Sequence, residues 1–193
     1  MKEHPILFSG PMVRAIIEGR KKQTRRVVKI PEIVRDENGE SEFTTIAGPD
    51  PNGEWHAWMT EYPEDGSVLL RCPYGQPGDL LWVRETWTPS PDGIIYRATE
   101  SDAGSLGPDD ENVWKPSIHM PRKYSRLSLR ITDVRVQRVQ EISYEDIRSE
   151  GWPIVENGNA LTFPELWDSI NAKRGYSWES NPWVWALTFE VAK

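Results

Sequence analysis

The chain has 193 residues and a net charge of −7, with 37% hydrophobic and 27% charged residues. This length favours a single domain over 1–193, and the composition excludes disorder along the whole chain. The one cysteine, Cys72, excludes an internal disulfide and a zinc site built from several cysteines. No apolar run approaches the roughly 18 residues of a membrane span, and the first residues are too polar for a signal peptide. We therefore expect a cytoplasmic protein that has no membrane partner.

The basic residues are concentrated in two segments, 14–29 and 115–138, which together hold fourteen of the 23 Lys/Arg residues. The rest of the chain is strongly acidic, which opposes indiscriminate binding of polyanions. Two such segments can still form a local site for an anion. The ten tryptophans suggest large flat surfaces for packing or stacking.

The first elements are predicted from capping signals and apolar spacing. Residues 5–9 are typical of a short strand. A helix follows, capped by Ser9 or Gly10 and ended by Gly19. The next strand is expected over 25–30.

The middle of the chain changes character. Residues 31–77 are rich in Pro, Gly, Asp and Glu, and we expect a loop-rich insertion with two small strands around 54–60 and 67–71. After it, 80–87 predicts a buried strand with 94–98 as its hairpin partner.

A long strand is predicted over 125–139, with a bend or bulge near Asp133, where the apolar alternation changes phase. Ser143 is expected to cap a short helix that reaches Glu150 and ends at Gly151.

Thr162 and Glu165 form a capping-box pattern that opens a further helix, which is expected to stop at Gly175. The alternating residues 182–192 predict a closing strand. This order has no βαβ rhythm, so we expect an α+β fold: a small mixed β-barrel with short peripheral helices and an inserted loop-rich segment.

The pair Lys21 and Thr24 lies in a basic turn after the first helix. A desolvated lysine with a lowered pKa can act as a base toward a hydroxyl nucleophile. The alternative is a solvated basic turn without chemistry. The three histidines are scattered, and no phosphate-binding glycine loop is present, so we expect neither a metal nor another cofactor.

Taken together, the pattern Gly19-x-Lys21-x-x-Thr24-x-Arg26 after a short strand and helix resembles the signature of ASCH domains, members of the PUA-like superfamily. The resemblance continues in CPYGQPGD, WVRETW, KPSIHMPR and NPWVW, as in an ASCH-type group common in bacteriophages and prophages. It covers most of the chain except about 31–70 and 99–113. It implies a small β-barrel that binds RNA or a nucleotide in a bacterial or phage-infected cell.

One branch of that family removes acetyl groups from N4-acetylcytidine. This similarity implies that Thr24 is a nucleophile and Lys21 its general base, and that Glu150 occupies the place of the catalytic glutamate. Arg26, or a backbone N–H near Thr24, would support the oxyanion. The alternatives are a ribonuclease, or a noncatalytic phage or prophage interaction protein acting through its tryptophan-rich insertion.

Five further residues are candidates for contact with RNA or a modified nucleoside. Glu85 lines a pocket or pairs with an arginine, and Trp82 stacks on a base or packs in the core. His119 is either structural or in contact with substrate. Arg122 and Arg126 suit phosphate contacts, or form a solvated strand edge.

Overall fold

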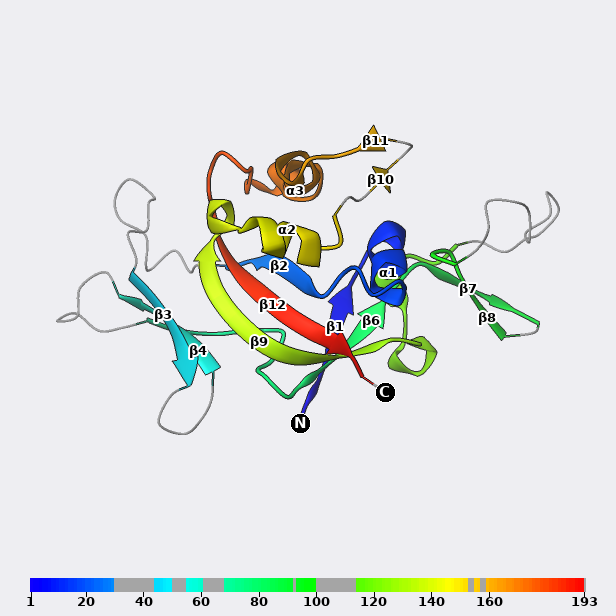
Figure 1. Ribbon diagram of the computed structural model, residues 1–193. Coiled ribbons are helices and arrows are strands. Elements are labelled where there is room, and N and C mark those ends of the chain that lie inside the picture. Colours follow the sequence, from blue (N-terminus) through cyan, green and yellow to red (C-terminus); the bar gives the residue numbers. More distant parts are fainter. Residues whose placement is uncertain are drawn as a thin grey trace.

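The computed structural model describes residues 1–29, 44–49, 55–60, 68–91, 93–99, 114–152, 155–156 and 159–192. Its centre is a five-stranded sheet with the strand order β1-β6-β9-β12-β2 (Figure 1). The strands are β1 (Glu3–Leu7), β6 (Leu80–Arg84), β9 (Ser128–Arg138), β12 (Trp183–Val191) and β2 (Gln23–Val27). β1 and β6 are parallel, and the other neighbours are antiparallel.

The mixed sheet and the short helices confirm the predicted α+β class. The expected closed barrel is not detected: in the described part of the chain, pairing runs from β1 at one edge to β2 at the other. β12, which lies between β9 and the edge strand β2, is buried over five consecutive residues, Trp183–Leu187. A strand that is covered on both faces in this way loses the simple alternation of buried and exposed residues.

The predicted bend of the long strand is confirmed as an irregularity in pairing. Thr188 pairs with Asp133 and Phe189 pairs with Ile131, so Thr132 has no partner on β12. An extra residue of this kind bends a strand and increases its twist. β9 and β12 curve together across the molecule in Figure 1.

Two smaller sheets involve the segments on either side of β6. β3 (Thr44–Pro49), β4 (Trp55–Thr60) and β5 (Val68–Arg71) form an antiparallel sheet. β4 and β5 match the two predicted strands, whereas β3 was not predicted. The rest of the 31–77 insertion up to residue 67 lies outside the described residues.

The predicted hairpin with 94–98 is confirmed only at the Trp87 end of the predicted strand 80–87, which is divided into two strands. β6 ends at Arg84, and the partner of β8 (Gly93–Tyr96) is the separate strand β7 (Trp87–Ser90). The chain leaves the main sheet at Glu85, a buried residue whose carboxylate forms an ion pair with Arg126.

The helices begin and end close to the predicted residues. α1 (Gly10–Ile17) has Ser9 as its N-cap, α2 (Tyr144–Ser149) is capped by the Ser143 side chain, and α3 (Phe163–Asn171) opens with a capping box. Short 3₁₀ helices occur at Ser117–His119, Arg122–Tyr124, Val139–Glu141 and Ala172–Arg174, and β10 (Val155–Glu156) pairs with β11 (Asn159–Ala160).

One hydrophobic cluster joins segments from before and after the insertion, including Ile6, Val13, Leu81, Ile131 and Leu187. A second, smaller cluster holds α3 against the ends of β9 and β12, through Val139, Phe163, Trp167 and Val184. In Figure 1, α2 lies over β2, and α3 lies beyond α2. No helix in the described residues has the length and apolarity needed to cross a bilayer.

Candidate functional site

Lys21 and Glu150 lie side by side at the junction of β2 and α2. After α1, Gly19 adopts φ 73°, and the backbone N–H of Lys21 donates to the carbonyl of Ala15. This turn brings Lys21 into an antiparallel bridge with Glu150, the residue that ends α2. The amide of Lys22 donates to the Ser149 carbonyl at 2.7 Å, which extends the contact.

The Lys21 ammonium is fully enclosed and donates to three oxygens. Its Nζ lies 2.7 Å from Glu150 Oε2, 2.8 Å from the Glu150 carbonyl and 2.9 Å from the Gln23 carbonyl. Burial lowers the pKa of Lys21, and the neighbouring Glu150 carboxylate opposes that shift. An ammonium has three N–H donors, so all of them are used here.

Gly151 makes this close approach possible. Its φ of 92° lies in the left-handed region, and a Cβ built on it would stand 3.0 Å from Lys21 Cβ and 3.1 Å from Ala15 Cβ. A larger residue would push the end of α2 away from Lys21. The glycine therefore holds Glu150 against the β2 entrance.

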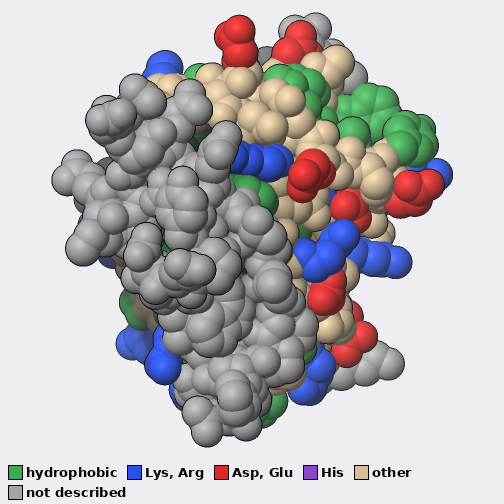
Figure 2. All heavy atoms as spheres, turned by 90° about the vertical axis from the view of Figure 1, so that its left-hand side faces the viewer, with side chains coloured by type: hydrophobic (Ala, Val, Ile, Leu, Met, Phe, Trp, Pro, Cys, Tyr) green, Lys and Arg blue, Asp and Glu red, His purple; other side chains and the backbone are tan. Residues whose placement is uncertain are grey.

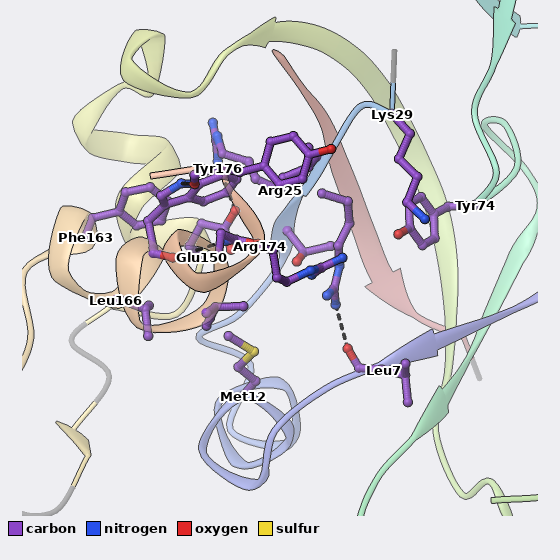
Figure 3. A pocket seen from close by; sticks show the side chains of 16 residues that line it. Leu7, Met12, Arg25, Lys29, Tyr74, Glu150, Phe163, Leu166, Arg174 and Tyr176 are labelled. Atoms are coloured by element: carbon purple, nitrogen blue, oxygen red, sulfur yellow. Dashed lines mark hydrogen bonds and ion pairs between the residues drawn. The ribbon is translucent and has the colours of Figure 1, made fainter. Parts of the chain in front are cut away.

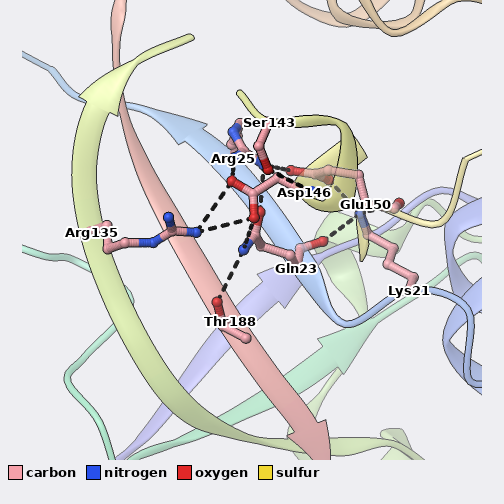
Figure 4. A network of polar contacts seen from close by, with 8 residues as sticks. All are labelled: Lys21, Gln23, Arg25, Arg135, Ser143, Asp146, Glu150 and Thr188. Carbon is pink, nitrogen blue, oxygen red and sulfur yellow. Dashed lines mark hydrogen bonds and ion pairs between the residues drawn. The ribbon is translucent and has the colours of Figure 1, made fainter. Parts of the chain in front are cut away.

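A polar network links Glu150 to the sheet (Figure 4). Arg25 donates to Glu150 Oε1 at 3.1 Å and to Asp146 Oδ2 at 2.7 Å. Gln23 donates from its Nε2 to Asp146 and to Thr188, both at 3.1 Å. These contacts fix α2 on β2, and thereby the position of the Glu150 carboxylate.

Asp146 is the centre of that network. Arg135 donates to both of its carboxylate oxygens at 3.3 Å. Burial alone raises the pKa of Asp146, but the hydrogen bond from Gln23 and the charges of Arg25 and Arg135 outweigh it and hold the pKa below the usual value. Asp146 is therefore a carboxylate under ordinary conditions.

A cavity of about 210 Å³ opens beside this network (Figure 3). Thr24, Arg26 and Glu150 all line it, whereas Lys21 stands behind Glu150 and is not part of the lining. The Thr24 residue is buried, with 3% of its surface exposed. The resemblance singled out four residues: Lys21, Thr24, Arg26 and Glu150. The cavity brings three of them together, all except Lys21.

Arg26 has an unusual environment in this cavity. Its Nη2 donates to the Leu7 carbonyl at 2.6 Å, and the guanidinium lies 5.1 Å from the centroid of the Phe8 ring. Its Nε is buried and has no hydrogen-bond partner among the described residues. Burial lowers the pKa of Arg26, although its guanidinium remains charged at any ordinary pH.

The wall of the cavity comes from segments that the sequence did not connect to β2. Figure 3 shows Phe163 and Leu166 on one side, with Glu150, and Tyr74 and Lys29 on the other. Trp167, Tyr176 and Arg174 also contribute to the lining. Lys29 belongs to the basic segment noted in the sequence, but no sequence signal placed α3 and the turn after it beside Thr24.

The other predicted contact residues lie elsewhere. None of Trp82, Glu85, His119, Arg122 and Arg126 lines the cavity. Arg126 forms a bidentate ion pair with Glu85, at 2.9 Å for each bond, and its guanidinium lies 4.1 Å from the centroid of the Tyr96 ring. Arg122 pairs with Glu3 at 2.8 Å, and Arg84 lies 5.3 Å from the centroid of the Trp82 ring. His119 is exposed in a 3₁₀ helix.

A metal centre and a reactive cysteine are the two remaining chemical possibilities. No group of three His, Cys, Asp or Glu side chains in the described residues is placed to hold a metal ion. Burial raises the pKa of the Cys72 thiol to about 12. A thiol with so high a pKa forms little of the reactive thiolate at neutral pH.

Comparisons of this chain with protein-family models, with curated proteins and with solved structures find no match.

Proposed function

We propose that the protein is an ASCH-type, PUA-like protein that binds a pyrimidine nucleoside or nucleotide in the Thr24 cavity and hydrolyses the amide of an N4-acylated cytidine. One observation carries the proposal: Thr24 and Glu150 line the same cavity, and Glu150 is held there by Lys21. These are the three residues to which the resemblance assigns the chemistry. The long β9–β12 pair and the short α2 helix after β9 are compatible with the PUA-like part of the proposal.

The proposed reaction has two stages. The Thr24 hydroxyl adds to the acyl carbonyl and loses its proton, and the C–N bond of the tetrahedral intermediate then breaks. The cytosine amine leaves with a proton, and the acyl group remains as an ester on Thr24. Water hydrolyses this ester to release the carboxylic acid. A backbone N–H near Thr24 would stabilise the oxyanion, so that Arg26 remains available to bind the substrate elsewhere.

The contacts of Lys21 and Glu150 support a different division of roles within this proposal. Lys21 can accept a proton only as a neutral amine, and in the structure its Nζ is used for three hydrogen bonds and lies behind the cavity wall. Glu150 has a carboxylate at the cavity itself. We therefore assign proton transfer with Thr24 to Glu150, and assign to Lys21 the positioning of that carboxylate.

The decisive experiment is incubation of the protein with N4-acetylcytidine, with cytidine and acetate measured by mass spectrometry. Thr24→Ala should abolish hydrolysis but retain binding, because only the covalent step needs the hydroxyl. Thr24→Ser should retain part of the activity. Hydrolysis at the wild-type rate by Thr24→Ala would remove Thr24 as the nucleophile.

The assignment within the Lys21–Glu150 pair has its own test. Glu150→Gln should abolish hydrolysis, and Glu145→Gln, an exposed residue of the same helix, is the matched control. A Lys21→Met variant should retain residual activity with an altered pH profile, because Glu150 remains but loses the ammonium that fixes it. Complete loss in Lys21→Met with full activity in Glu150→Gln would return the base role to Lys21.

The ribonuclease and interaction alternatives have less support from the described residues. The basic residues Arg122 and Arg126 already have carboxylate partners. On the face shown in Figure 2, the described acidic and basic side chains are interspersed rather than separated into a basic patch. The tryptophan-rich part of the insertion falls largely outside the residues whose side chains are described. Short RNAs in the same incubation test the ribonuclease alternative directly.

A further inference from the structure

The cavity has an excess of positive charge. Lys29 and Arg174 line it and are exposed, and neither forms an ion pair or hydrogen bond with another described residue. The carboxylate in the lining, Glu150, is already bound by Lys21 and Arg25. Within the described part of the chain, these two cations and Arg26 therefore form no ion pair with a carboxylate, although the net charge of the chain is −7.

Arg26 is the least exposed of these three cations, and its buried Nε has no acceptor among the residues that the structure describes. A buried N–H that lacks an acceptor is unfavourable, and a hydrogen bond between a charged donor and an anion is among the strongest available. Arg174 lines the same cavity as Arg26. Burial is the main cause of the lowered pKa of Arg26, and the charge of Arg174 adds to that lowering. One anion between the two guanidinium groups would relieve the repulsion and supply the missing acceptor.

We infer that the ligand of this cavity carries a phosphate group, which Arg26, Lys29 and Arg174 bind, so that the substrate is a pyrimidine nucleotide rather than the free nucleoside. A phosphate monoester offers three acceptor oxygens and close to two negative charges, which suits three cations better than a neutral sugar hydroxyl does. The identity of the base rests on the proposed function, whereas the phosphate site rests only on the cations and the buried Nε.

Calorimetric titration with cytidine and with cytidine 5′- and 3′-monophosphate tests the phosphate site. At least one monophosphate should bind about tenfold more tightly than cytidine, and added salt should reduce that preference. Arg174→Gln should remove most of the preference. Lys173→Gln is the matched control, because Lys173 is an exposed cation of the same 3₁₀ helix outside the cavity lining. Equal affinity for nucleoside and both nucleotides would overturn the inference, as would a preference that survives Arg174→Gln.

Hydrolysis assays separate this inference from the proposed function. If N4-acetylcytidine and its 5′-monophosphate are hydrolysed with equal kcat/KM, the proposed function holds and the phosphate site is overturned. If neither is hydrolysed but the nucleotide binds in an Arg174-dependent manner, the phosphate site stands and the hydrolase proposal fails. Binding of a 5′-phosphorylated RNA oligonucleotide without binding of either mononucleotide would overturn the mononucleotide assignment.

Discussion

Lys21 and Glu150 are joined twice, once through the carboxylate and once through the main chain. The Lys21 Nζ donates to Glu150 Oε2 at 2.7 Å and to the Glu150 carbonyl at 2.8 Å, across 129 positions of sequence. The second bond satisfies a carbonyl at the end of α2, where helix carbonyls lack partners within the helix. The lysine therefore fixes both the helix end and the side chain that the helix presents to the cavity.

Removing the Lys21 ammonium should destabilise the fold strongly. In Lys21→Met the enclosed Glu150 carboxylate keeps only Arg25 as a charged partner, and the two carbonyls lose their donor. We expect a loss of about 3–5 kcal/mol in the free energy of unfolding, measured by urea denaturation at pH 7. Lys22→Met, at the exposed neighbouring position, should change it by less than about 0.5 kcal/mol. Similar values for the two variants would contradict a structural role for the Lys21–Glu150 pair.

Gly151 should tolerate alanine much less well than Gly175 does. Both residues have positive φ, 92° and 85°, so both substitutions introduce left-handed strain of about 1–2 kcal/mol. A Cβ at Gly175 meets no atom within 4 Å, whereas one at Gly151 meets Lys21 and Ala15. The extra destabilisation of Gly151→Ala over Gly175→Ala, about 1–3 kcal/mol, measures that crowding. Equal losses by urea denaturation would show that the contact with Lys21 relaxes freely.

Asp146 should stabilise the fold only when it is ionised. Its folded pKa lies below the unfolded value of about 3.9. The stabilisation is therefore present above that unfolded value and is lost as pH falls through the folded pKa. At pH 7, Asp146→Asn should lower the free energy of unfolding by about 1.5–3 kcal/mol, and the difference from wild type should shrink below pH 4.

Urea denaturation at a series of pH values from 7 to 3 measures this convergence. Asp133→Asn is the control, since Asp133 forms a solvent-exposed pair with Arg135 and should contribute less than about 1 kcal/mol. A difference between wild type and Asp146→Asn that stays constant down to pH 3 would exclude ionisation of Asp146 as the source of the stabilisation.

Arg126 and Arg122 should differ in their effect on stability. Arg126 pairs with the Glu85 carboxylate, whose side chain is 2% exposed, while Arg122 pairs with Glu3 at the surface. Arg126→Gln should destabilise the protein by about 3 kcal/mol, because it leaves Glu85 buried and uncompensated. Arg122→Gln should have an effect below about 1 kcal/mol.

The double variant Glu85→Gln/Arg126→Gln provides the control for that comparison. Removing both charges should recover part of the loss, as expected for two residues that interact directly. If Arg126→Gln unfolds at the same urea concentration as wild type but weakens RNA binding, the phosphate-contact interpretation of Arg126 would be the better one.

The sequence alone determined the local elements and the residues of the motif. Capping residues, glycines and apolar spacing predicted α1, α2 and α3 and the bend in β9, because these features depend on neighbours within a few positions. The motif around Lys21 and Thr24 and the position of Glu150 were also identified from the sequence. The break in the predicted strand 80–87 was not identified, because no local pattern shows that the buried Glu85 pairs with the distant Arg126.

Only the tertiary structure decided which of these residues share a cavity. Packing of α3 against Val139 and Val184 brings Phe163, Trp167 and Arg174 beside Thr24. The same packing leaves Lys21 behind the wall that Glu150 forms. Such contacts join residues more than a hundred positions apart, and their geometry depends on side-chain volume and burial rather than on local pattern. The excess positive charge of the cavity has the same origin. The fold places several cations but only the Glu150 carboxylate in the lining, and local sequence patterns do not predict this placement.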